Sequence, residues 1–268
     1  MAKIDPTARV ADGAQLADDV EIGPFCIIGP GVTLAEGVRL ESHVNIQGAT
    51  RIGARTRIFP FASLGTPPQS VHYKGEPTAL EIGSDCLIRE HATASIGTVA
   101  GGGVTRIGNG VMMMTGAHVG HDCQVGQQVI FANNAVLGGH VSVGDFTFLG
   151  GQCAVHQFTR IGAQCMISGL TGVREDVIPF ANVLGQAGKL VGLNVIGMKR
   201  RGFSKTQLHE ARAVYRDLFF GDGTFDARLE RVRAGAGDSG FAADVLAFID
   251  ADRKRPLCHP SRGVIKEA

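Results

Sequence analysis

The sequence predicts a mainly β protein, built as a long solenoid of short stacked strands with a C-terminal α-helical domain. Three observations predict this fold class. An apolar residue recurs at every sixth position over residues 4–64 and again over residues 107–173. Glycine, at 38 of 268 residues, is about twice as frequent as in an average protein. The period then fades and helical patterns follow, so we expect domains at residues 1–190 and 191–268.

A period of six residues fits neither an α-helix nor one long strand, but it fits a short strand followed by a turn. The position four residues after each apolar one holds only Ala, Val, Thr or Cys in both stretches. If both positions face inward, the stacked units enclose a column of large aliphatic and small side chains. Five of the six cysteines occupy the small position, where we expect them to be buried apolar groups.

This pattern resembles the hexapeptide-repeat transferases. The resemblance implies a left-handed parallel β-helix with three hexapeptides in each coil. Residues 18 positions apart would then lie one above the other, separated by the strand spacing of about 4.8 Å. The repeat is interrupted at about 65–81 and 96–106, which are rich in Pro or Gly. We expect these segments to be loops extruded from the solenoid, and loops on a rigid scaffold often carry function.

The C-terminal part of the chain has helical signals instead. Ser204 and Gln207 have the spacing of a capping box in front of an amphipathic segment at 205–220. Residues 224–232 and 242–249 also predict helices. The tail is therefore expected to form a small helical domain rather than further coils.

Composition argues against several classes of protein. The 26 Lys and Arg against 25 Asp and Glu give a formal net charge of +1, without the basic excess of a general nucleic-acid binder. The longest stretch without Asp, Glu, Lys or Arg, 123–144, contains Gln and Asn and predicts no transmembrane segment. The first residues show no apolar run of a signal peptide, and the six cysteines form no CxxC pair. We therefore expect a cytoplasmic protein.

Four histidines stand out because none of them occupies an inward position of the repeat. They are His118, His121, His140 and His156. A single histidine on such a surface is usually a solvated turn residue. Four of them close together in the chain, next to Asp and Gln residues and near two extruded loops, indicate a functional site.

Coils of 18 residues would bring these side chains together. His121, Gly139 and Gln157 would form one column along the solenoid. Asp122 and His140 would form the column beside it. We therefore expect imidazoles, a glycine peptide, an amide and a carboxylate within about 10 Å, which is two strand spacings.

This cluster suits general-base chemistry. A neutral histidine, with an ordinary pKa of about 6.5, can accept a proton, a carboxylate can fix its tautomer, and a glycine N–H can stabilise an oxyanion. The cluster holds no nucleophilic Ser or Cys, which favours direct acyl transfer to a hydroxyl or an amine. A zinc site is a rival interpretation, because imidazoles on adjacent coils can bind metal. His118 and His121 lack the wider HxxxxH spacing of hexapeptide carbonic anhydrases, so we expect no metal and no other cofactor.

Four segments carry a more specific resemblance: GAHVGHDCQVG, FANNAVLGGHVSVGD, GGQCAVHQFTRIGA and GLNVIGMKRRGFS. Over nearly its whole length the chain resembles the acyl-ACP–UDP-N-acetylglucosamine O-acyltransferases, which catalyse the first step of lipid A biosynthesis. The resemblance implies a homotrimer with active sites between neighbouring β-helices. It also implies transfer of an (R)-3-hydroxyacyl chain from acyl carrier protein to the 3-hydroxyl of UDP-N-acetylglucosamine.

The same resemblance implies roles for individual residues. His121 would be the catalytic base, Asp122 the residue that orients it, and Gly139 the donor to the oxyanion. Gly169 would lie where the acyl-chain length is set. The residues implied in substrate binding, the last three on the nucleotide or carrier-protein side, are Gln69, His118, His140, Gln157, Gly169, Asn194, Arg200 and Arg201.

Some positions depart from the family pattern, namely Ser70, His72, Ser95, Ile96, Ala187 and Ile196. These departures leave two acceptors open, the 3-hydroxyl sugar nucleotide and a 3-amino analogue that would give an amide product. A metal-dependent hexapeptide-repeat enzyme is the other enzymatic alternative, and a purely structural β-helix would lack the histidine cluster. The sequence does not fix the natural acyl-chain length.

Overall fold

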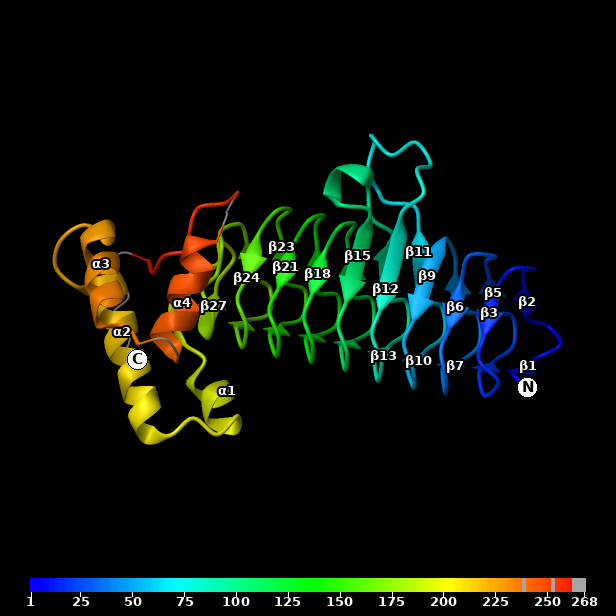
Figure 1. Cartoon of the computed structure of the whole chain (residues 1–268), viewed down its shortest axis with the longest axis horizontal. Coiled ribbons are helices and arrows are strands. Elements are labelled where there is room, and N and C mark those ends of the chain that lie inside the picture. The colour runs from blue at the N-terminus through cyan, green and yellow to red at the C-terminus, as the bar shows by residue number, and fades with distance from the viewer. Residues whose placement is uncertain (238–239, 252–253, 262–268) are drawn as a thin grey trace.

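The computed structural model describes residues 1–237, 240–251 and 254–261, and its main body is a left-handed parallel β-helix (Figure 1). Three sheets of short, mostly parallel strands form the walls of a long three-sided prism. We name them sheets A, B and C in the order in which the chain first enters them. This architecture confirms the fold class that the six-residue period predicts.

Within the described residues, sheet A has 11 strands: β1 (Lys3–Ile4), β4 (Glu21–Ile22), β7 (Arg39–Leu40), β10 (Arg57–Ile58), β13 (Leu87–Ile88), β16 (Met112–Met113), β19 (Ile130–Phe131), β22 (Phe148–Leu149), β25 (Met166–Ile167), β27 (Ala181–Leu184) and β28 (Lys189–Leu193). Sheet B has nine in the same part of the chain: β2 (Arg9–Val10), β5 (Ile27–Ile28), β8 (Asn45–Ile46), β11 (Ser63–Thr66), β14 (Thr93–Ser95), β17 (His118–Val119), β20 (Val136–Leu137), β23 (Ala154–Val155) and β26 (Gly172–Val173). Sheet C, counted likewise, has eight: β3 (Gln15–Leu16), β6 (Thr33–Leu34), β9 (Ala49–Ile52), β12 (Ala79–Ile82), β15 (Val104–Ile107), β18 (Gln124–Val125), β21 (Ser142–Val143) and β24 (Arg160–Ile161).

Strand pairing follows the expected register of 18 residues. His118 pairs with Val136, and Val136 pairs with Ala154 one coil further on. Where a loop is inserted the register lengthens, so that Ile58 pairs with Ile88, 30 positions later. The coils therefore stack without a break, and the loops are additions to an intact scaffold.

Three edges join the sheets, and we name each by the sheets that the chain leaves and enters: the AB, BC and CA edges. Most coils turn there through a residue with φ near +60°, a conformation that Gly, Asn and Asp adopt most easily. On the BC edge these residues include Asp122, His140 and Phe158, with φ of 62°, 60° and 64°. Because they are one coil apart, their side chains follow one another along the edge.

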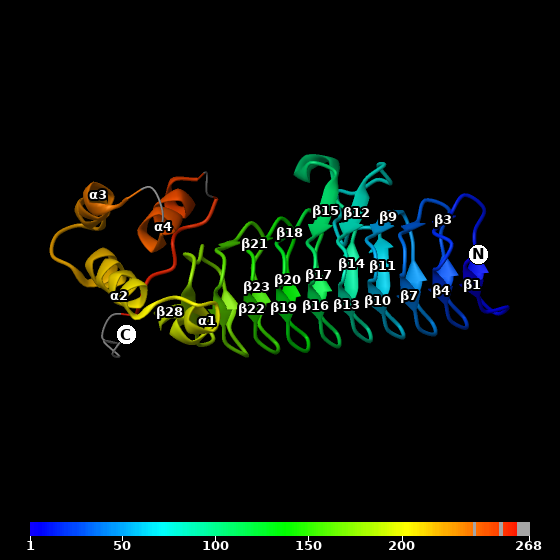
Figure 2. The same cartoon turned by 60° about the horizontal axis from the view of Figure 1, so that its bottom comes forward.

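Both extruded loops leave the solenoid at the BC edge. The first loop, residues 67–78, joins β11 to β12, and the second, residues 96–103, joins β14 to β15. The second contains a short 3-10 turn, η1 (Val99–Gly101). They project side by side from the same side of the prism in both views (Figures 1 and 2). Two segments that interrupt the repeat are thus placed next to the predicted histidine cluster.

The interior of the prism is apolar, as the repeat predicts. From Ile22 onward the large aliphatic positions are buried, for example at Ile46, Leu64 and Leu149, whereas Ile4 in the first coil is exposed. All six cysteines are buried and free. Burial raises the pKa of Cys123 and of Cys165 to about 12, so these thiols are protonated core groups rather than nucleophiles.

Beyond the last coils, the antiparallel pair of β27 and β28 leads into four helices within the described residues. They are α1 (Val195–Arg200), α2 (Lys205–Phe220), α3 (Phe225–Gly235) and α4 (Phe241–Asp250). Ser204 and Gln207 form the predicted capping box at the start of α2. None of the described helices is long and apolar enough to cross a membrane.

The sequence pattern did not predict α1 or the β27–β28 hairpin. A helix of six residues is too short to show periodicity, and α1 is started by Asn194, whose side chain accepts a hydrogen bond from Gly197 N–H. In the last coils Arg160 forms an ion pair with the buried Asp176, in which Arg160 Nε lies 2.8 Å from Asp176 Oδ2. Arg160 also donates to the carbonyl of Phe248 in α4, which ties the helical domain to the last coils.

Candidate active site

A pocket of about 470 Å³ lies against sheet B beside the BC edge. Its lining combines residues of three coils with Gln69 from the first loop and Ser95 at the end of β14. The lining residues are Gln69, Ser95, His118, Gly120, His121, Val136, Leu137, Gly138, Gly139, Val155, His156 and Gln157. The structure therefore brings together six residues that the sequence marks out: Gln69, His118, His121, Gly139, His156 and Gln157.

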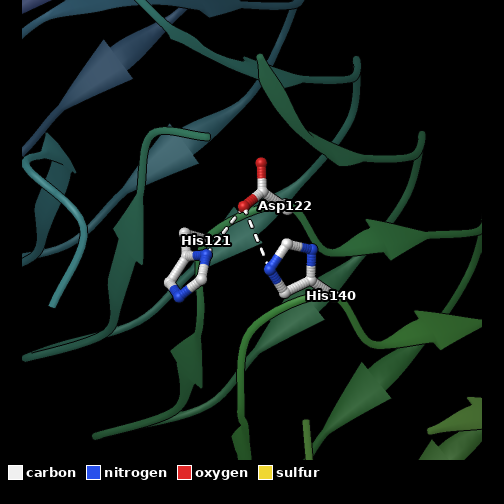
Figure 3. Close-up of side chains that lie close together, drawn as sticks. All are labelled: His121, Asp122 and His140. Carbon is white, nitrogen blue, oxygen red and sulfur yellow. Dashed lines mark hydrogen bonds and ion pairs between the residues drawn. The ribbon is translucent and has the colours of Figure 1, made fainter. Parts of the chain in front are cut away.

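His121 and Asp122 form the central interaction of the site. His121 Nδ1 lies 2.7 Å from Asp122 Oδ2, as the dashed line in Figure 3 shows. Because a carboxylate can only accept, this contact places a proton on Nδ1 of the imidazole. The other ring nitrogen, Nε2, is then the one available to accept a proton from a substrate in the pocket.

The aspartate is completely enclosed, and its side chain has 0% exposure. Thr98 donates its backbone N–H to Asp122 Oδ1 and its hydroxyl to Oδ2, both at 2.7 Å. Burial acts to raise the pKa of Asp122, but the hydrogen bonds from Thr98 and His121 outweigh it and hold that pKa below its ordinary value. Asp122 is therefore ionised at neutral pH despite its burial.

Gly139 lies one coil beyond His121, directly against the imidazole ring. A Cβ at this position would come within 2.5 Å of His121 Cε1 and 2.6 Å of Nε2, so any other residue would force the imidazole to move. The N–H of Gly139 donates to no described residue. This arrangement leaves a backbone donor beside the proposed base, where an oxyanion can accept from it.

His140 lies beside His121, against the same carboxylate oxygen of Asp122, and does not line the pocket. Its Nε2 is 3.6 Å from Asp122 Oδ2, and its ring meets that of His121 edge-on at 5.0 Å (Figure 3). It stacks on Phe158 at 4.4 Å, and Lys254 Nζ lies 4.9 Å from the Phe158 ring. Burial lowers the pKa of His140, although Asp122 opposes this, so His140 is a neutral packing partner of the aspartate.

His118 lines the sheet B side of the pocket. Its Nδ1 lies 2.8 Å from the hydroxyl of Thr93 on the preceding coil. Burial lowers its pKa, with a further contribution from His121, which keeps His118 neutral in the pocket. A neutral, oriented imidazole can hydrogen-bond a bound hydroxyl or amide without adding charge.

The structure adds contacts that the sequence reasoning missed. Arg255 donates to the carbonyl of Gln157 at 3.1 Å and to His156 Nδ1 at 2.7 Å, so the C-terminal tail contacts two residues that line the pocket. No sequence signal links residues 98 positions apart. Thr98 lies in a glycine-rich segment whose sequence predicts only a loop, and its contact with Asp122 depends on how that loop folds.

Besides His140, four more of the implied substrate residues lie away from this pocket. Gly169 is on the AB edge, between β25 and β26, and a Cβ there would lie 3.1 Å from the carbonyl oxygen of Gly151. Asn194 uses both ends of its amide within the chain, accepting from Gly197 N–H and donating to the carbonyl of Gln164. Its side chain therefore caps the start of α1.

The two arginines lie near the CA edge. Arg201 stacks on Phe146 at 4.9 Å and donates to its carbonyl at 3.0 Å. Arg200, at the end of α1, is exposed. Burial lowers the pKa of Arg201, and the positive charge of Arg200 lowers it further. Within one chain, the arginines and the histidine pocket lie at different edges of the prism.

Among the described residues, His121, Asp122 and His140 offer three ligand atoms within 4.8 Å of one another, enough to consider a metal. Two ligands bound tetrahedrally to one zinc ion lie about 3.3 Å apart, since each bond is about 2.0 Å. The 2.7 Å between His121 Nδ1 and Asp122 Oδ2 is instead a hydrogen-bond distance. The geometry therefore fits a proton-sharing pair better than a metal site.

Comparison with known proteins gives the family. A relative from Azorhizobium caulinodans, named acyl-[acyl-carrier-protein]–UDP-N-acetylglucosamine O-acyltransferase, is 67% identical over 267 residues, covering 100% of this chain and 98% of its own length. The chain belongs to this acyltransferase family. A relative of the same name from Caulobacter vibrioides is 50% identical over 204 residues, covering 76% of this chain and 78% of its own.

Family patterns and solved structures agree with this assignment. Residues 176–258 of the acyltransferase match the family described as UDP N-acetylglucosamine O-acyltransferase, domain 2, and residues 105–139 match the bacterial transferase hexapeptide repeats. The structure of LpxA from Acinetobacter baumannii is 38% identical, with a TM-score of 0.92 over 96% of this chain and 99% of that one. A UDP-N-acetylglucosamine acyltransferase from Campylobacter jejuni has a TM-score of 0.90 at 34% identity, over 97% of this chain and 100% of that one. The chain is thus an acyltransferase in both sequence and fold.

Proposed function

We propose that the acyltransferase moves an (R)-3-hydroxyacyl chain from acyl carrier protein to the 3-hydroxyl of UDP-N-acetylglucosamine, the first step of lipid A biosynthesis. The names of its close relatives support the donor and the acceptor. The observation that carries the chemistry is the His121–Asp122 pair, with Gly139 against the imidazole ring and its N–H not used by any described residue. Base, orienting group and oxyanion donor thus stand together in one pocket.

The proposed reaction uses each of these groups once. His121 Nε2 takes the proton of the acceptor hydroxyl as its oxygen attacks the thioester carbonyl. The Gly139 N–H donates to the oxygen that becomes negative in the tetrahedral intermediate. Asp122 stabilises the imidazolium that forms. When the intermediate collapses, the C–S bond breaks, and the carrier's thiolate leaves and recovers the proton from His121.

A homotrimer accounts for the separation of the pocket from the two arginines. When sheet B of one copy faces sheet A of the next, the BC edge of the first lies beside the CA edge of the second. The other pairings of faces in a ring of identical prisms keep these two edges apart. Arg200 and Arg201 of the partner subunit would then supply positive charge for the nucleotide diphosphate or for an acidic carrier protein.

The test is an assay of purified protein with acyl carrier proteins of different acyl length and with two acceptors. We expect an ester product with UDP-N-acetylglucosamine and much slower transfer to the 3-amino analogue. If the enzyme instead prefers the 3-amino analogue and forms an amide, the proposed acceptor is wrong.

Ile96 is one of the departures from the family pattern. It is buried and packs near Gly48, so it gives no support to the amine acceptor.

The proposal places the enzyme in the cytoplasm. All six cysteines are free, which suits a reducing compartment. Its proposed donor, an acyl carrier protein, has to reach the pocket from the same compartment. Fractionation of cells that express the tagged protein at native level would test this placement.

A further inference from the structure

The second loop folds back onto the catalytic aspartate rather than projecting freely. Thr98, 24 positions before Asp122, satisfies both carboxylate oxygens, through its N–H and its hydroxyl. The Thr98 hydroxyl in turn accepts from Gly101 N–H at 3.2 Å. The Thr98 oxygen thus accepts a hydrogen bond from Gly101 on one side and donates its own proton to Asp122 Oδ2 on the other.

The glycines of this loop allow the close approach. A Cβ on Gly101 would overlap the Asp122 carboxylate, and one on Gly97 would lie 2.9 Å from its Oδ1. The loop is tied down by Gly103 N–H, which donates to the carbonyl of Thr98 at 2.8 Å. Loop backbone therefore covers the aspartate and accounts for its complete burial.

We propose that Thr98 is a positioning residue for catalysis, which keeps Asp122 ionised and aimed at His121. The inference rests on the proposed function, since it assumes that His121 is the base. A buried carboxylate without donors is costly and tends to take up a proton. Thr98 supplies two of the three short hydrogen bonds that Asp122 accepts, and His121 supplies the third. The loop is thus part of the catalytic apparatus.

The direction of the pH effect follows from the active form, in which Asp122 is ionised and His121 is neutral. Without the Thr98 hydroxyl, ionised Asp122 loses a hydrogen bond and becomes less stable relative to its protonated state. The His121–Asp122 pair therefore takes up a proton at a higher pH. The acidic limb of the kcat/KM profile should move to higher pH by about one pH unit, the effect of one hydrogen bond to a charged group.

The experiment compares Thr98→Val with Thr98→Ser in the full-length protein. Valine has the shape of threonine without the hydroxyl, so we expect kcat to fall about tenfold to a hundredfold, with KM for the sugar nucleotide nearly unchanged. Serine keeps the hydroxyl and should restore most of kcat and the original acidic limb. Thr98→Ala serves as a second variant if the valine does not fold, and it should shift the limb in the same direction.

A matched control is Thr7→Val in the first coil. Thr7 also donates its hydroxyl to a carboxylate, Asp5 Oδ1 at 2.6 Å, but far from the pocket, so kcat and the pH profile should not change. Wild-type kcat and an unshifted acidic limb in Thr98→Val would overturn the inference. Activity in His121→Ala would instead overturn the proposed base, so the two failures are distinguishable.

Discussion

At the scale of single residues, His121 carries the largest prediction. Its imidazole is oriented by Asp122 on one nitrogen and faces the pocket with the other. We expect His121→Ala to fold normally and to lose about 10²–10⁴-fold in transfer rate, the usual contribution of a general base. His209→Ala, an exposed histidine on α2, is the control and should retain full activity. More than about a tenth of the wild-type rate in a well-folded His121→Ala would assign the base elsewhere.

Metal dependence is also decided by individual contacts. The short His121–Asp122 distance leaves no room for an ion between these atoms. Transfer should therefore continue after prolonged dialysis against a chelator, measured beside an untreated sample. Complete loss of turnover, with recovery when zinc is added back, would make the cluster of His121, Asp122 and His140 a metal site after all.

At the scale of elements, the six-residue repeat predicted most of the scaffold and the core of the site. Because stacking is strictly periodic, spacings of 18 residues were enough to bring His121 beside Gly139. The path of the second loop has no such period, and so the bond from Thr98 to Asp122 was not predictable. The same holds for Arg255, which reaches Gln157 only through the packing of the tail on the coils.

The position of Gly169 shows a second limit of the repeat. It lies 48 positions after His121, between two and three coils further on, or about 13 Å along the prism at the strand spacing. His121 follows β17 at one end of the sheet B strands, whereas Gly169 precedes β26 at the other end. An acyl chain that starts at the base would therefore have to cross sheet B as well as run along it.

Gly169→Met tests whether this element limits the acyl chain. With glycine we expect chains of about 12 to 14 carbons, and methionine should shift the preference to about ten, because filling an apolar groove excludes the longer chain. The measurement is kcat/KM for each carrier-bound acyl length in both proteins. Gly185→Ala, in the β27–β28 turn, has open space but a φ of +96°, and controls for a general effect of replacing glycine. Unchanged selectivity in Gly169→Met would remove Gly169 from the acyl groove.

At the scale of the whole molecule, the edges of the prism differ in what covers them. A ladder of aromatic rings runs along the N-terminal part of the AB edge, with centroids 5.0, 5.0 and 5.1 Å apart: Phe25, His43, Phe61 and His91. All four have φ near +60°, which Phe does not favour, and Phe25 and Phe61 remain 55% and 52% exposed. By contrast, Phe158 and Phe180 on the other edges are covered by the C-terminal region.

In the proposed trimer the aromatic ladders of the three copies would contact one another. If sheet B of each copy faces sheet A of the next, sheet C points outward and the three AB edges meet at the threefold axis. We therefore expect Phe61→Asp to dissociate the trimer, because three carboxylates would be brought together where apolar rings pack. Activity should fall with it, since each pocket would lose the arginines of the partner subunit. Phe220→Asp, at another exposed ring on α2, should stay trimeric and active. The masses are measured by sedimentation or light scattering, and a fully trimeric Phe61→Asp at low protein concentration would place the AB edge away from the axis.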